Sequence, residues 1–85
     1  MNQSVRIDKW LWSARIYKTR TLDTEACRKG QVRIAGVKVK PPRMVTEGEI
    51  LNVRKNPLTL TLKILSPIQN RVPARLIPEV LQDLT

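Results

Sequence analysis

Two short alternating segments, separated by Ala35-Gly36, constrain the fold of this chain more than any other feature of its sequence. Val32 and Ile34 alternate with polar residues before this dipeptide, and Val37 and Val39 alternate with lysines after it. A side-chain period of two residues is typical of β-strands that bury one face. A two-residue loop would set Ile34 opposite Val37 and the two remaining valines opposite each other, which gives the hairpin one apolar face.

The same register places cations opposite polar or charged residues on the other face of the hairpin. Arg33 would lie opposite Lys38, and Gln31 opposite Lys40. Like charges that face each other directly across a strand pair are mildly destabilising. An anionic partner would relieve this repulsion, so we interpret the face as a candidate binding surface.

Two segments before the hairpin have the apolar spacing of helices. The stripe in residues 7–17 consists of Ile7, Trp10, Leu11, Ala14 and Tyr17. Residues 21–29 predict a second, shorter helix with Leu22 on its apolar side. A threonine at its start could cap this helix, and Gly30 is well placed to end it.

Alternation returns in residues 49–54 and is strongest in residues 58–64, which predicts two further strands. Residues 78–84 could form one or two final helical turns. Two helices followed by about four strands indicate an α+β domain in which both helices pack on one side of a small, mainly antiparallel sheet. We expect residues 56–85 to add a strand and a short C-terminal segment to a core formed by residues 1–55.

The inventory of side chains argues against several functional classes. The 85 residues include no histidine and one cysteine, which leaves no pair for an internal disulfide and no cysteine-histidine metal site. Cys27 is interpreted as a packed helix residue. The carboxylates show no catalytic spacing, the three glycines form no phosphate-binding loop, and no apolar run is long enough to span a membrane. We therefore expect a cytoplasmic binding protein, not an enzyme, without cofactor, metal or membrane contact.

Positive charge is concentrated in the N-terminal half of the chain. Sixteen Lys and Arg against seven Asp and Glu give a formal net charge of +9. Residues 1–43 hold eleven basic and three acidic side chains, and so carry +8 of this charge. The cations fall on the first helix and its exit, at the end of the second helix and along the hairpin. If the second helix returns beside the first, these groups share one surface, which predicts a polyanionic partner and most often nucleic acid.

The two tryptophans cannot both belong to the apolar stripe of the first helix. Trp10 lies in the stripe and is assigned to the core. Trp12 falls on the opposite side of the helix, near Lys9 and Arg15. There it either stacks on an RNA base or is covered by a later strand or the C-terminal segment.

Three motifs in the first half of the chain carry a resemblance to a known family. They are Arg6-Ile7-Asp8-Lys9-Trp10-Leu11, then Lys18-Thr19-Arg20-Thr21-Leu22, then Gly30-Gln31-Val32-Arg33-Ile34 with Gly36. Together they resemble the RNA-binding domain typified by ribosomal small-subunit protein four, called the S-four domain or alpha-L motif. The resemblance runs from about Val5 to Val53 and is strongest toward the small ribosome-associated heat-shock proteins built around this domain.

The resemblance implies a function and a set of contact residues. The ligand would be structured ribosomal RNA, with transfer RNA as a second candidate. The setting would be the large ribosomal subunit, in rescue or quality control of stalled nascent chains. Within an RNA-binding core of residues 1–55, Arg6 and Arg20 are implied as the strongest contacts, and Asp8 as a residue that orients a neighbouring arginine. The further candidates are Lys9, Arg15, Lys18, Thr19, Lys29, Gln31, Arg33, Lys38, Lys40 and Arg43.

Two residues depart from the pattern of the family. Ala35 stands where asparagine usually precedes the hairpin glycine. Because alanine tolerates a positive φ poorly, we expect a turn other than type I′. Asp23 stands where the family often has a packed alanine. Because a buried carboxylate is costly unless paired, we expect Asp23 at an exposed edge or acting at the helix start.

Two other functions remain open. A DNA-binding module would use the second helix for recognition, although that helix is short and acidic at its start. No dimerisation element is evident, and we expect a monomer. The chain could also direct a separate RNA-modifying enzyme to its RNA, because S-four domains often precede such catalytic domains.

Overall fold

The two longer helices lie in the N-terminal third of the chain and strands dominate the rest, as the change in apolar spacing predicts. The computed structural model describes residues 3–55 and 57–85. Its elements follow one another as β1 (Ser4–Arg6), α1 (Ile7–Ser13), α2 (Arg20–Arg28), β2 (Val32–Ile34), β3 (Val37–Lys38), β4 (Met44–Thr46), β5 (Ile50–Lys55), β6 (Leu58–Ile64), η1 (Ala74–Leu76), α3 (Ile77–Val80) and β7 (Leu81–Asp83).

Helix α1 supplies the centre of the hydrophobic core. Ile7, Trp10 and Leu11 are completely buried, and Ala14 just beyond the helix is nearly so. The indole Nε1 of Trp10 donates a hydrogen bond to the Ser66 carbonyl oxygen at 2.9 Å, so its polar atom is satisfied inside the core. The apolar stripe predicted for this segment is therefore confirmed.

Helix α1 ends at Ser13, earlier than the predicted residue 17. The amide of Arg15 donates to the Trp12 carbonyl and that of Ile16 to the Leu11 carbonyl, the two hydrogen bonds of a Schellman motif. Arg15 occupies the left-handed position of this motif with a φ of 63°. Glycine usually fills that position, so the sequence contains no ordinary stop signal there.

Helix α2 begins one residue earlier than predicted and ends where Gly30 was expected to end it. The Thr19 hydroxyl accepts a hydrogen bond from the Leu22 amide at 3.2 Å, which identifies Thr19 as the N-cap. Gly30 has a φ of 73° and follows the last turn in a second Schellman motif. Leu22 was predicted to line the apolar side of the helix, but its side chain is 46% exposed.

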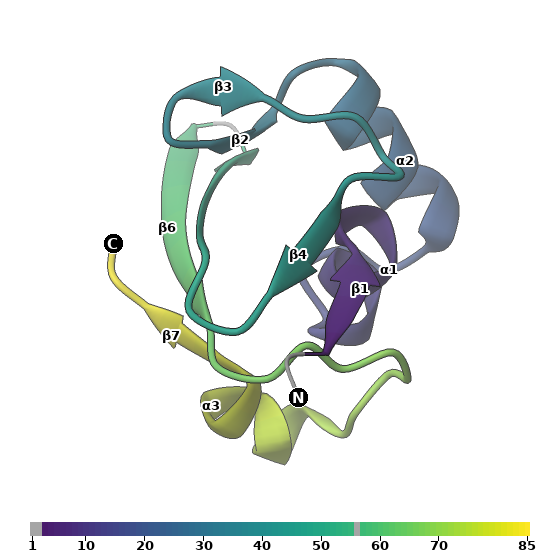
Figure 1. Ribbon diagram of the computed structural model, residues 1–85, viewed down its shortest axis with the longest axis vertical. Helices are drawn as coiled ribbons and strands as arrows, with labels where there is room; N and C mark the ends of the chain where they lie inside the picture. The colour runs from purple at the N-terminus through teal and green to yellow at the C-terminus, as the bar shows by residue number, and fades with distance from the viewer. Residues whose placement is uncertain (1–2, 56) are drawn as a thin grey trace.

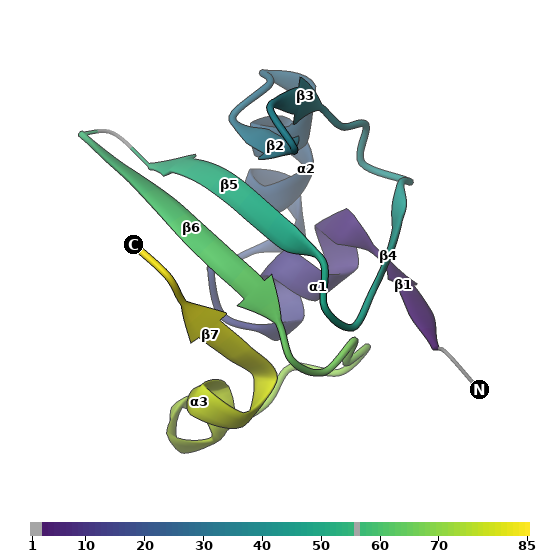
Figure 2. The same ribbon diagram turned by 60° about the vertical axis from the view of Figure 1, so that its left-hand side comes forward.

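Five strands form one antiparallel sheet in the order β3-β2-β5-β6-β7. Figure 2 shows α1 and α2 together behind this sheet. Alternate residues of three central strands are buried in the same cluster as the helix side chains: Val32, Leu51, Val53, Leu62 and Ile64. The predicted α+β arrangement, with both helices on one side of an antiparallel sheet, is confirmed.

The hairpin between β2 and β3 has the predicted register. Ile34 pairs with Val37, and Arg33 pairs with Lys38. Ala35 and Gly36 have φ values of 53° and 78°, and positive φ at both central residues is the mark of a type I′ turn. The expectation of another turn type was therefore wrong, because the register requires the tight turn despite alanine. Val37 was placed on the apolar face but is 63% exposed, since β3 lies at the edge of the sheet.

Three short strands were not predicted from the sequence. Strand β1 pairs with β4 in a separate two-stranded sheet, where the nearly buried Val5 lies opposite the buried Val45. Figure 1 shows this pair beside α1. At the other end of the chain, α3 leads directly into β7, which pairs with β6. Val80 and Leu81, at this junction, are buried and belong to the hydrophobic core.

Trp12 is half buried, and the C-terminal segment covers part of it. The guanidinium carbon of Arg71 lies 5.8 Å from the centroid of the Trp12 ring, a cation–π contact. This favours the interpretation of Trp12 as a packed residue over a role in stacking on a base.

Candidate nucleic-acid interface

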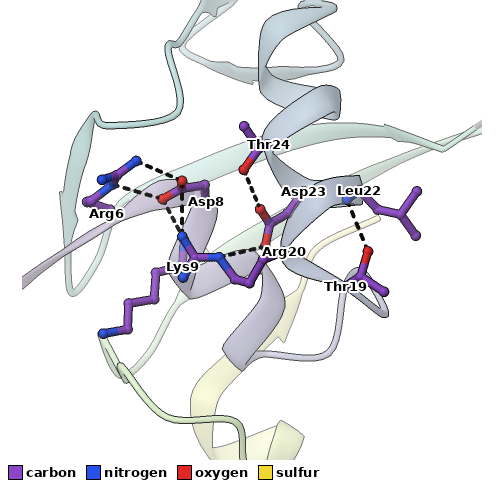
Figure 3. A network of polar contacts seen from close by, with 8 residues as sticks. All are labelled: Arg6, Asp8, Lys9, Thr19, Arg20, Leu22, Asp23 and Thr24. Carbon is purple, nitrogen blue, oxygen red and sulfur yellow. Dashed lines mark hydrogen bonds and ion pairs between the residues drawn. The ribbon is translucent and has the colours of Figure 1, made fainter.

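Asp8 holds two arginines side by side at the start of the helices (Figure 3). Its side chain is buried and accepts hydrogen bonds from Nε and Nη2 of Arg6 at 3.2 and 3.0 Å. Oδ2 also accepts from Nη2 of Arg20 at 3.2 Å, and Oδ1 accepts from the Lys9 amide at 2.8 Å. The side chains of Arg6 and Arg20 are 51% and 43% exposed. The predicted role of Asp8 in orienting arginine agrees with these contacts, and it extends to two arginines.

Asp23 is a second buried carboxylate in this network. Its Oδ1 accepts the Thr24 hydroxyl at 3.1 Å, and its Oδ2 lies 3.7 Å from Nε of Arg20. Burial raises the pKa of Asp23 to about 6, and the Thr24 hydrogen bond and the Arg20 charge oppose that shift only in part. Of the two alternatives expected for Asp23, an exposed edge or the helix start, the structure shows the second. Arg20, one turn earlier, brings a cation to the buried carboxylate.

A hollow lies between α2 and the segment after β3, and we call it the helix–hairpin hollow. Four cations line it: Arg6, Arg28, Lys38 and Lys40. The other lining residues are Thr24, Cys27, Val39, Pro41 and Pro42. No carboxylate occurs among the described lining residues. The hollow thus joins an arginine of the Asp8 network to the end of α2 and to the hairpin.

A second hollow lies over the other side of the hairpin, and we call it the sheet hollow. Its lining residues are Lys29, Gly30, Gln31, Arg33, Lys38, Asn52, Arg54, Pro57 and Thr59. Lys38 lines both hollows, so they adjoin. Members of the three groups of cations recognised in the sequence therefore lie along adjoining hollows from Arg6 to Arg33, and Asp8 joins Arg20 to Arg6.

Six of the predicted contact residues line neither hollow, and one of them, Arg20, is joined to Arg6 through Asp8. Arg15 ends α1, and its Nη1 donates to the Val72 carbonyl oxygen at 3.2 Å. Thr19 caps α2, and Nη2 of Arg43 pairs with Glu49 at 3.6 Å. Lys9 is half buried on α1, and Lys18 is exposed in the connection between the helices. Arg15 and Thr19 thus have structural roles at the helix ends, and contact of these residues with RNA stays a prediction.

Two cations of this surface are absent from the predicted contact set. Arg28 was noted in the basic end of α2, but nothing in the sequence separated it from a solvated helix end. Arg54 lies in the nearly neutral half of the chain, and only strand pairing brings it to the hairpin: its amide donates to the Gln31 carbonyl oxygen at 2.7 Å. The one sequence signal for the position of Arg54 was the alternation in β5. Leu51 and Val53 point inward there, so Arg54 points to the polar face.

The described residues offer little for catalysis. Within residues 3–55 and 57–85, no group of three His, Cys, Asp or Glu side chains is arranged to hold a metal ion. Cys27 is buried, as expected of a packed helix residue, and burial together with the charges of Asp8 and Asp23 raises its pKa to about 12. A thiol in that state is a poor nucleophile at neutral pH. No helix in the described part of the chain has the length and apolarity to cross a membrane.

Comparison with known sequences identifies the source of this architecture. The sequence model of the S4 domain matches residues 5–51, which contain the Asp8 network, α2 and the hairpin. The chain belongs to the S4 domain family. The resemblance to the S-four domain that its motifs suggested is thereby confirmed.

Relatives within the S4 domain family place the chain more closely, among the heat shock protein 15 group. It is 39% identical over 70 residues to heat shock protein 15 of Escherichia coli K12, an alignment that covers 82% of this chain and 53% of that protein. It is 38% identical over 64 residues to the RQC P-site tRNA stabilizing factor of Listeria monocytogenes, covering 75% of this chain and 70% of that protein. The chain thus spans about half the length of the heat shock protein 15 relatives that it matches.

A solved structure also supports placing this chain in the heat shock protein 15 group. The trimeric structure of heat shock protein 15 from Vibrio cholerae superposes with a TM-score of 0.89 at 32% sequence identity, over 95% of this chain and 82% of that one. That relative was solved as a trimer, so the monomer expected from the sequence gains no support from it.

Proposed function

We propose that this protein binds structured RNA of the large ribosomal subunit through the surface that runs from Arg6 and Arg20 into the helix–hairpin hollow, with transfer RNA as a second ligand. One observation carries the proposal: Asp8 holds two guanidinium groups together at the rim of a hollow lined by four cations. Guanidinium groups bind phosphate oxygens through paired hydrogen bonds. Because both arginines are about half exposed, they can contact Asp8 and a phosphate at the same time.

The names of the relatives supply the biological setting of the proposal. Proteins called RQC P-site tRNA stabilizing factor are among those to which this S4 domain chain is similar. We propose a role in rescue or quality control of stalled nascent chains on cytoplasmic large subunits, by binding and without catalysis. A single copy carries the whole surface, so a monomer is sufficient for binding. Residues 1–55 would form the RNA-binding core, and the buried Val80 and Leu81 support assigning residues 56–85 to the same domain.

The test must remove the two arginines without leaving Asp8 as an unpaired buried charge, which would unfold part of the protein. The informative variant is therefore the triple change Arg6→Ala, Asp8→Asn and Arg20→Ala, which lowers the net charge by one. Arg75→Ala lowers the net charge by the same amount at an exposed position that lines neither hollow. Because Arg20→Ala also removes the cation beside the buried Asp23, circular dichroism and thermal unfolding check that both variants are folded.

Two measurements decide the proposal. In filter binding to ribosomal RNA of the large subunit, the triple variant should lose at least roughly tenfold in affinity, while Arg75→Ala loses little. In sedimentation of cell extract, the wild type should travel with large subunits and accumulate where peptidyl-tRNA is trapped. Equal affinity of the triple variant and the wild type would refute the site. Stronger binding of a particular duplex DNA than of ribosomal RNA would favour a DNA-binding module instead.

A further inference from the structure

The face of the sheet that α1 and α2 leave uncovered carries two rows of polar side chains. Strand pairing sets Arg33 beside Lys38 on one side and beside Asn52 on the other, and Asn52 beside Thr61. In the second row Arg54 pairs with Thr59. Directly paired residues point to the same face of a sheet, and the alternate residues of these strands are the buried core residues. The first row therefore crosses from β3 to β6 and the second joins β5 to β6, on the face of the sheet opposite the helices, whose position Figure 2 shows.

The sheet hollow sits over these rows and is strongly positive. Lys29, Arg33, Lys38 and Arg54 line it, with the polar side chains of Gln31, Asn52 and Thr59. The described lining residues include no carboxylate, and Pro57 is the one bulky apolar side chain among them. The cores of protein–protein interfaces are depleted in charge and rich in aromatic residues, so this composition argues against a protein partner.

Lys38 joins this hollow to the helix–hairpin hollow, and Gly30 makes room for it. A Cβ atom at Gly30 would lie 2.8 Å from Cε and 2.9 Å from Cδ of Lys38, so the lysine stem lies directly over the glycine. Lys38 lines both hollows, so its side chain lies at the ridge where they meet. A phosphate bound at this ridge would be shared by both hollows.

We infer that the sheet hollow is a second RNA-contact site, which takes the ribose-phosphate backbone of the RNA strand after it leaves the helix–hairpin hollow. This inference rests on the proposed function and lengthens its surface. Neighbouring strands lie ~4.8 Å apart, so the path from β3 to β6 is about 14 Å long, enough for a short run of nucleotides. Arginine and lysine bind the phosphates, while the amide of Asn52 and the hydroxyl of Thr59 match the hydrogen-bonding groups of ribose.

The site reaches beyond the part of the chain that the S4 domain model matches. That match ends at residue 51, whereas Arg54 and Thr59 lie on β5 and β6 after it. The surface of this chain is therefore longer than the family match alone indicates, and it includes Arg54.

The experiment uses two pairs of variants with equal charge change. Arg54→Ala is compared with Arg75→Ala, and Thr59→Glu is compared with Gln69→Glu; the control positions are exposed and line neither hollow. The probe is a fluorescein-labelled RNA stem-loop with a single-stranded tail, titrated at several salt concentrations. Arg54→Ala should weaken binding roughly three- to tenfold and reduce the slope of log affinity against log salt by about one. Thr59→Glu should weaken binding by at least as much, and the controls should change it less than twofold.

The outcomes separate this inference from the proposed function. If the triple variant at Arg6, Asp8 and Arg20 loses binding but Arg54→Ala and Thr59→Glu behave like their controls, the sheet hollow is not an RNA site and the first site stands. If the triple variant binds as well as the wild type, the proposed function itself fails. Thermal unfolding of each variant is measured in parallel. If Arg54→Ala lowers the thermal stability, the RNA affinity of Thr59→Glu decides whether the sheet hollow contacts RNA, because that variant leaves Arg54 in place.

Discussion

Oδ2 of Asp8 accepts a hydrogen bond from Nη2 of Arg20 at 3.2 Å, although the two residues lie twelve positions apart and on different helices. This contact ties the start of α1 to the start of α2. Arg6, at the end of β1, reaches the same carboxylate. The positions of both guanidinium groups therefore depend on how β1 and the helices pack. A sequence with the same number of cations but without Asp8 would not hold the two groups together in this way.

The first prediction concerns Asp8→Asn, which raises the net charge by one. If affinity for RNA followed net charge alone, this change would strengthen binding. If Asp8 positions the two arginines, binding should instead weaken by roughly fivefold, because an amide oxygen accepts weaker hydrogen bonds from guanidinium than a carboxylate does. The loss of these charge-assisted bonds should also lower the free energy of unfolding by about 1–3 kcal/mol. Titration of ribosomal RNA and urea unfolding measure the two effects.

Glu25→Gln is the matched control for Asp8→Asn. Glu25 is an exposed acidic residue on α2, and its removal changes the net charge by the same amount. It should leave stability nearly unchanged and RNA affinity equal or slightly higher. Tighter binding by both variants would contradict a positioning role for Asp8.

The second prediction compares two glycines with positive φ. Gly30→Ala and Gly48→Ala both force alanine into the left-handed region, at φ values of 73° and 91°, and each should cost roughly 1–2 kcal/mol of stability. An added Cβ at Gly48 meets no atom within 4 Å, whereas at Gly30 it would displace Lys38. Only Gly30→Ala should therefore weaken RNA binding, by about threefold. Equal RNA affinities of the two variants would show that the position of Lys38 does not matter.

The third prediction concerns the hairpin turn. Ala35 has a φ of 53°, which costs a non-glycine residue energy that asparagine partly avoids. Ala35→Asn should therefore raise the free energy of unfolding by roughly 0.5–1 kcal/mol, because Asn-Gly is a preferred type I′ turn. Ala35 is exposed at the tip of the hairpin and lines neither hollow, so RNA affinity should not change. Chemical denaturation is the measurement, and a destabilised variant would mean that the turn is not the strained element.

The regular elements of this fold were predictable where an apolar period lasted long enough to be read. Residues 7–13 and 20–28 span several turns of helix, and β6 alternates over seven residues. Strands β2 and β3 are as short as β1, β4 and β7, but the Ala35-Gly36 turn between them supplied a local signal. Strands β1, β4 and β7 have three residues each, and each pairs with a partner far along the chain without such a turn. Pairing of this kind is a tertiary property that a local pattern does not contain.

The candidate RNA-binding surface was also predictable from the sequence only in part. Arg6, Arg20 and the hairpin cations were recognisable by motif and charge, and the fold brings them together as expected. The place of Arg15 in a Schellman motif was not predictable, because no glycine marks that position, and its contact with RNA stays a prediction. Arg54 was missed because charge counted along the chain ignores the strand pairing that carries it to the hairpin.

The last prediction concerns the pH dependence of stability at Asp23. Folding raises the pKa of this carboxyl from 3.8 to about 6, so the folded state binds a proton more tightly than the unfolded state does. The contribution of Asp23 to stability is therefore greatest below about pH 4 and is lost as the pH rises to about 6, with a magnitude of order 2–3 kcal/mol. Asp23→Asn should remove this dependence. Urea unfolding of wild type and variant between these pH values tests it, and a difference between the two proteins that stays constant across that range would refute the assignment.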